Sequence, residues 1–243
     1  MRRILLPLIF GLMGTAVLAS LGVWQLQRLA WKESVLSEIE AAIGADPVPL
    51  PDIPDPERDR YLPVWAEGHM TGPTLRVLVS QKEKGAGYRL ITPFESGDRR
   101  VLIDRGFLPV DRPVPETPTR EVTVIGNLLW PDEVDGYTPE PDRDQGLWFA
   151  RDLPALAAEL GTEPLLIVLR DETFDDAGVS PLPVSSAGIP NDHLGYAVQW
   201  FGMALIWLVM TGILIYRNLR PRDDPREDPR KGTSAGAKKG ETT

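Results

Sequence analysis

The chain has 243 residues, a net charge of −9 and no cysteine. This length leaves room for one ordinary domain beside membrane segments. The lack of cysteine excludes disulfides, thiolate metal sites, covalently attached c-type haem and thiol redox chemistry. Residues 28–192 hold 16 Lys and Arg against 30 Asp and Glu, which argues against a nucleic-acid partner because phosphates would be repelled.

An uncharged apolar segment covers residues 4–25, near the N-terminus. At about 1.5 Å per helical residue it can cross roughly 30 Å of hydrocarbon, so it predicts a first transmembrane helix. A cleaved signal peptide is the alternative, because Arg2 and Arg3 precede the segment and Ala19 and Ser20 are small. The apolar run exceeds the roughly 7 to 15 residues typical of a signal peptide, which favours the membrane helix.

The central part of the chain is predicted to be mainly strands. Residues 31–43 can continue the first helix, and the proline-rich residues 45–57 end it. A second helix is expected to start at Leu153 and to end at Gly161. Runs rich in β-branched and aromatic residues predict strands at 61–68, 74–81, 87–95, 99–110, 121–130 and 165–172.

Short turns between these strands, such as residues 95–98, favour hairpins. Hairpins give an antiparallel sheet, which can curl into a barrel. We therefore expect an α+β membrane protein, in which two transmembrane helices flank one β-rich, mainly antiparallel extracytoplasmic domain.

A second uncharged apolar segment covers residues 194–216. Basic residues follow it, starting at Arg217, and only acidic charges lie between Arg170 and its start, so its C-terminal end is predicted to be cytoplasmic. With both chain ends inside, the central domain is expected in the periplasm or an equivalent space. This divides the chain into a first transmembrane helix (4–25), a periplasmic domain (26–192), a second transmembrane helix (193–216) and a disordered cytoplasmic tail (217–243).

The outer end of the second helix carries the most informative residue, His193. Tyr196 and Trp200 follow at i+3 and i+7, so a helix places all three on one face. A neutral imidazole at the membrane boundary can supply one axial ligand to haem iron while the porphyrin lies against the apolar face. The alternative is an interfacial histidine that begins the helix, beside two aromatic residues of the interfacial belt.

The outer end of the first helix repeats Trp24, Arg28 and Lys32 at four-residue intervals. Cations at this depth can pair with haem propionates. They can equally extend to the water boundary and anchor the helix end. Asn191 and Asp192 are expected to cap the second helix, because their side chains accept from free backbone amides.

Three other polar residues are candidates for chemistry. His69 is expected to be a surface or turn histidine. Asp104 and Arg105 suggest an acid and a clamp, but charged residues on a half-buried strand are expected to face water or to pair locally. The sequence gives little support to hydrolytic catalysis.

Several segments together resemble the Surfeit locus protein (Surf-one) family of cytochrome c oxidase assembly factors. Their order and spacing make the match specific. The segments are LGVWQLQRLAWK, YLPVWAEG, GYRLITPF followed by VLIDRGFLPV, VIGNLL, LWFARDLPALAAELG and DHLGYAVQWFGM.

The resemblance implies a bacterial inner-membrane protein that is not an enzyme, binds haem a and assists its insertion into the oxidase catalytic subunit. In that family the histidine of an HLxYxxxW pattern is the proposed haem ligand, which maps to His193, Tyr196 and Trp200. A WQxxR pattern maps to Trp24, Gln25 and Arg28. The implied partners are the oxidase catalytic subunit, membrane lipid and, as a further candidate, the haem a synthesis enzyme. Asp104 departs from the family, where many members have Asn.

Two other functions stay open from the sequence. One is a haem-independent membrane scaffold that stabilises an oxidase assembly intermediate, with His193 shaping a helix end. The other is an anchored periplasmic enzyme, which needs a polar pocket with a perturbed acid or base.

Overall fold

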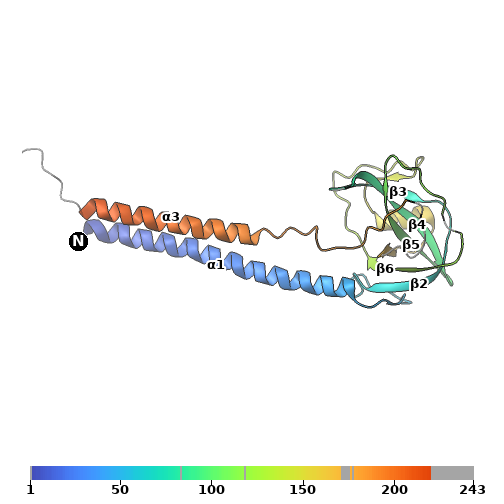
Figure 1. Ribbon diagram of the computed structural model, residues 1–243, viewed down its shortest axis with the longest axis horizontal. Coiled ribbons are helices and arrows are strands. Elements are labelled where there is room, and N and C mark those ends of the chain that lie inside the picture. Colours follow the sequence, from blue (N-terminus) through green and yellow to red (C-terminus); the bar gives the residue numbers. More distant parts are fainter. Residues whose placement is uncertain (1, 83, 118, 171–175, 177, 220–243) are drawn as a thin grey trace, which may run out of the picture. The chain divides into compact units, whose positions relative to one another are not determined.

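The computed structural model describes residues 2–82, 84–117, 119–170, 176 and 178–219 (Figure 1). It divides into two compact units, one made of residues 2–31 and 191–219 and the other of Lys32–Pro190. Helices α1 (Arg2–Gly44) and α3 (His193–Leu219) are both long and apolar enough to span a membrane. Most of the tail predicted to be disordered, beyond Leu219, lies outside the described residues.

The first unit is a pair of helices, formed by α1 and α3 (Figure 1). They meet through small residues. Gly11 and Gly22 of α1 are buried, and so are Ala197 and Ala204 of α3. A Cβ added to Gly22 would lie 2.8 Å from ring atoms of Phe201. Because lipid gives apolar helices no hydrophobic reason to associate, small residues that let their backbones approach closely hold such pairs together.

The positions that face the partner helix recur every three or four residues, and we call them the seam. This is the period of two helices that supercoil gently around each other. The seam positions are Gly11, Thr15, Leu18, Gly22, Gln25 and Leu29 on α1, and His193, Ala197, Trp200, Ala204, Trp207 and Thr211 on α3.

The second unit contains a closed five-stranded barrel in the order β2–β6–β8–β5–β4, with β4 pairing back to β2. Every barrel pair is antiparallel except β5–β8. This confirms the predicted α+β class and its mainly antiparallel domain. The barrel strands are β2 (Pro63–Met70), β4 (Gly85–Ser96), β5 (Arg99–Pro109), β6 (Val122–Leu129) and β8 (Leu166–Leu169).

Three further strands extend the sheet: β1 (Val48–Pro49), β3 (Leu75–Gln81) and β7 (Leu147–Trp148). The sequence predicted β3 and all five barrel strands. It did not predict β1 and β7, because each has only two residues and so shows no alternation of apolar and polar side chains.

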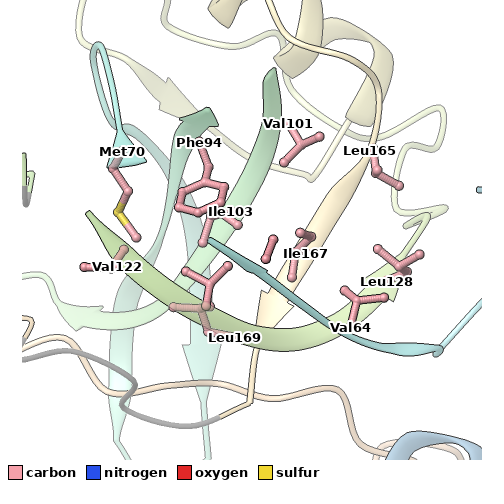
Figure 2. Close-up of a cluster of buried hydrophobic side chains, with 12 residues drawn as sticks. Val64, Met70, Phe94, Val101, Ile103, Val122, Leu128, Leu165, Ile167 and Leu169 are labelled. Atoms are coloured by element: carbon pink, nitrogen blue, oxygen red, sulfur yellow. The ribbon is translucent and has the colours of Figure 1, made fainter. Parts of the chain in front are cut away.

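All five barrel strands contribute apolar side chains to one buried cluster, including Val64, Phe94, Ile103, Leu128 and Ile167 (Figure 2). A second buried cluster joins residues of β4, β5, β6 and β8, together with β3 and β7, to helix α2 (Leu153–Leu160). Helix α2 begins and ends as its sequence predicts. The Asp152 carboxylate accepts from the Ala155 amide, and Gly161 adopts the left-handed conformation (φ 62°) that ends a helix.

The barrel also binds the C-terminal end of α1. The Asn127 side-chain amide donates to the Ile43 carbonyl at 3.0 Å, and the Arg170 guanidinium donates to the carbonyls of Ile43 and Ala45. Helix carbonyls in the last turn have no partner within the helix, and a cation there is favourable. The barrel therefore supplies the polar cap that α1 lacks in its own last turn.

Asp104 and Arg105 of β5 are both buried, with 0% and 1% of their surfaces exposed. The Asp104 carboxylate accepts from Arg89 at 2.5 Å and from the Gly106 amide at 3.1 Å. Arg105 forms a bidentate ion pair with Asp176, which lies 71 residues further along the chain. The prediction that these two residues face water is therefore wrong, and Arg105 does not pair locally.

Removal of the Arg105 side chain should destabilise the barrel strongly. Arg105→Ala leaves Asp176 as a buried carboxylate without its partner, which costs about 3–5 kcal/mol. Denaturant unfolding of the full chain in detergent should show this loss. Arg120→Ala, which removes an exposed arginine, is the matched control and should change little. An equal, small effect of both variants would contradict the structural role of the pair.

A second pair, Glu133 with Arg151, should make stability depend on pH. Burial raises the pKa of Glu133, but the Arg151 guanidinium donates to its carboxylate and outweighs burial, so the pKa lies below its ordinary value near 4.5. A carboxyl with a lowered folded pKa stabilises the fold above its unfolded pKa, and this contribution is lost as pH falls through the folded pKa.

We therefore expect Glu133→Gln to lower the unfolding free energy at neutral pH. The difference from the unmodified chain should shrink as the pH falls below about 4.5. Urea titrations at a series of pH values measure this difference. Glu57→Gln, at an exposed carboxylate, should show no such convergence.

Candidate functional site

His193 is the first residue of α3 and forms a hydrogen bond to α1. Its Nδ1 lies 2.8 Å from Oε1 of Gln25. Gln25 is buried, with 8% of its surface exposed, whereas His193 is partly exposed. Nε2, the other ring nitrogen of His193, has no hydrogen bond to a residue that the structure describes.

The sequence on both sides explains why these two side chains meet. Gly22 lies one turn before Gln25, and Ala197 lies one turn after His193. Both small residues are buried in the seam and keep the helices close at this level. Gln25 and His193 can therefore reach each other.

The other predicted binding residues of α3 differ in their exposure. Trp200 lies on the seam with His193 and is partly buried. Tyr196 is 52% exposed, because it lies beside the seam. His193 and Trp200 therefore both lie on the seam, and Tyr196 lies beside it.

Among the described residues, no hydrogen bond joins His193 to Trp24, Arg28 or Lys32 of α1. Trp24 is 54% exposed. The Arg28 guanidinium stacks on Trp31, 3.9 Å from the ring centroid. Lys32, in the second unit, donates to the Pro190 carbonyl. Arg28 is thus held as a cation beside an aromatic ring, just after the apolar segment of α1.

An apolar groove of about 570 Å³ runs between the two helices deeper in the pair. Its lining is almost wholly apolar and includes three methionines, whose flexible side chains adapt to irregular shapes. The lining residues are Phe10, Met13, Gly14, Val17, Leu18, Met203, Ile206, Trp207 and Met210.

The groove lies on the same side of the helix pair as two of the predicted residues. Positions seven apart return to the same side when the seam repeats every three or four residues. Trp24 follows Val17 by seven residues, and Tyr196 precedes Met203 by seven. Along the helix, Met203 is about 10 Å deeper than Tyr196 at 1.5 Å per residue.

Two further expectations have definite outcomes. His69 is a surface histidine as expected, with its side chain 52% exposed and Nε2 3.5 Å from Glu95. Asn191 does not cap α3, because its Oδ1 is buried and lacks a hydrogen-bond partner among the described residues. The expected capping role of Asn191 is therefore wrong.

The donor set around His193 suits a single-ligand site. Within the described residues, no group of three or more His, Cys, Asp or Glu side chains could hold a metal ion. One imidazole nitrogen is what a haem iron needs from one axial position.

Sequence reasoning gave Gln25 no role toward His193, although one signal was available. Gln25 continues the three-and-four spacing of the small and apolar residues Gly11, Leu18 and Gly22, whereas Gln27 does not. A polar residue on an otherwise apolar helix face calls for a partner on the facing helix.

The model of the SURF1 family matches residues 12–205, a range that includes both Gln25 and His193. The chain belongs to this family. "Surfeit locus protein 1" of Rattus norvegicus is 31% identical over 214 residues, covering 75% of this chain and 67% of the relative. The Homo sapiens protein of that name is also 31% identical, over 76% of this chain and 69% of its own length. A "SURF1-like protein" of Rickettsia felis is 30% identical over 83% of this chain and 92% of its own length.

Enlarging Gly22 should separate the helices at the level of the histidine. Gly22→Leu forces its new side chain into Phe201, so α1 and α3 should move apart near Gln25 and His193. Leu26 and Leu194 are exposed and can be replaced by cysteines that carry spin labels, because the chain has no other cysteine. Pulsed electron paramagnetic resonance then measures the distance between the two labels. Gly202→Leu, where an added Cβ meets nothing within 4 Å, is the matched control. An unchanged distance in Gly22→Leu would show that the seam does not depend on this glycine.

Proposed function

We propose that this SURF1-family chain is a cytochrome c oxidase assembly factor that binds haem a as cargo at the outer membrane boundary. In this proposal it assists the insertion of haem a into the oxidase catalytic subunit. The observation that carries the proposal is the His193 imidazole, held by Gln25 at the end of an apolar helix pair, with Nε2 free of hydrogen bonds to described residues.

The residues around His193 fit the chemistry of the cargo. Haem a combines an iron, a flat apolar ring, two propionates and a long isoprenoid tail. His193 would ligate the iron, with Tyr196, Trp24 and Trp200 beside the ring. Arg28 would meet a propionate near water. The apolar groove, on the side of Trp24 and Tyr196, would take the tail.

The proposed role is that of a carrier and not of an enzyme. One histidine ligand holds iron less firmly than a complete ligand set, which suits a protein that must pass its cargo on. The partners would be the oxidase catalytic subunit and the haem a synthesis enzyme, both reached within the membrane.

The proposed orientation follows the charges that flank the two spans. Arg217 at the end of α3 lies on the cytoplasmic side, so the barrel lies in the periplasm of a bacterial inner membrane. His193 then lies at the periplasmic boundary.

Loss of the His193 imidazole should abolish haem binding. The full chain, purified in detergent from cells that make haem a, should show a haem spectrum, and His193→Ala should lose most of it. Gln199→Ala removes an exposed side chain from the same helix and should keep the spectrum.

A different result would replace the carrier with the haem-independent scaffold. In that case the unmodified chain carries no haem, although oxidase assembly still depends on it. His193→Ala then leaves the haem content of the oxidase near normal.

A further inference from the structure

We propose that Gln25 is a positioning residue: its amide oxygen fixes His193 as the Nδ1–H tautomer and leaves the Nε2 lone pair for iron. The inference rests on the proposed haem-carrier function for its purpose. The assignment of the tautomer itself depends only on the Gln25–His193 contact.

The tautomer follows from the chemistry of the two atoms in contact. An amide oxygen can only accept a hydrogen bond, so Nδ1 of His193, 2.8 Å away, must donate. A neutral imidazole carries one ring proton, so Nε2 then has none. The unprotonated nitrogen is the one able to bind a metal.

Burial makes this hydrogen bond decisive for the orientation of the ring. Gln25 is 8% exposed and lies in the seam, where little water competes for its oxygen. An unsatisfied amide in such a place costs free energy, which holds the ring and the amide together. The opposite amide orientation would donate to Nδ1 and move the ring proton to Nε2, so a measurement of the tautomer separates the two arrangements.

An acceptor behind a ligating histidine also tunes the metal. It fixes the ring plane and strengthens electron donation through the imidazole, and loss of such a partner typically weakens metal affinity by roughly 10- to 100-fold. Gln25→Leu should therefore weaken haem binding by about this factor. Gln27→Leu is the matched control, because Gln27 is exposed and off the seam.

The first experiment reads the tautomer without haem. The full chain in detergent micelles is labelled with ¹⁵N-histidine, and ring couplings are recorded at a pH where both imidazoles are neutral. The chain has two histidines, so His69→Gln identifies the His193 signals. We expect Nδ1–H in the unmodified chain and in Gln27→Leu. In Gln25→Leu we expect the mixture of tautomers that a free imidazole shows.

The second experiment separates positioning from a merely steric role. Gln25→Glu keeps an acceptor and donates more charge toward the imidazole, so it should retain haem. The reduction potential of the bound haem should fall in the order Gln25→Leu, unmodified chain, Gln25→Glu. A steric role predicts no such order.

The outcomes distinguish this inference from the function on which it rests. An Nε2–H tautomer in the unmodified chain, or a tautomer that Gln25→Leu leaves unchanged, overturns the positioning role even if haem binds. An Nδ1–H tautomer that is lost in Gln25→Leu supports it. If the unmodified chain nevertheless never takes up haem, the carrier function fails and the positioning of the ring stands.

Discussion

A polar side chain between two apolar helices must find its partner on the facing helix, and Gln25 and His193 satisfy each other in this way. Little water reaches the seam, so an unpaired amide there would be costly. The first unit depends on this constraint. Small residues bring the helices close enough for the two side chains to meet, and their meeting fixes which faces of α1 and α3 oppose each other.

In the barrel, buried charged side chains also require partners. Asp104 and Arg105, neighbours on β5, are buried and reach different partners, Arg89 and Asp176. A buried pair contributes little net stability over an apolar alternative, but a buried charge without its partner is strongly destabilising. Such pairs therefore constrain which strands and loops lie together. In the helix pair one neutral hydrogen bond does this, and in the barrel several ion pairs do.

Local patterns were enough to predict most of the fold. Apolar length predicted both long helices, and runs of β-branched residues bounded by turn residues predicted β3 and the barrel strands. The domain boundaries placed at residues 25, 192 and 216 stay predictions. The burial of Asp104 and Arg105 could not be predicted, because their partners Arg89 and Asp176 lie 15 and 71 positions away.

The candidate site shows the same limit at closer range. His193 could be selected from its place before an apolar helix, and its position in the seam agrees with a special role. Its partner Gln25 required knowledge of which faces of two distant helices meet. The spacing of Gly11, Leu18 and Gly22 contained that information for α1 alone. Pairing the two faces needed the three-dimensional structure.

A neutral acceptor behind the histidine suits a carrier better than a charged one. A carboxylate in place of Gln25 would push more electron density through the ring and bind iron more firmly, which favours a resident cofactor. It would also place a charge in the seam at a considerable desolvation cost. An amide orients the ring at lower cost and leaves the iron–nitrogen bond weaker. In the proposed carrier, one orienting hydrogen bond and one ligand give a site that can hold haem a in a defined pose and still release it.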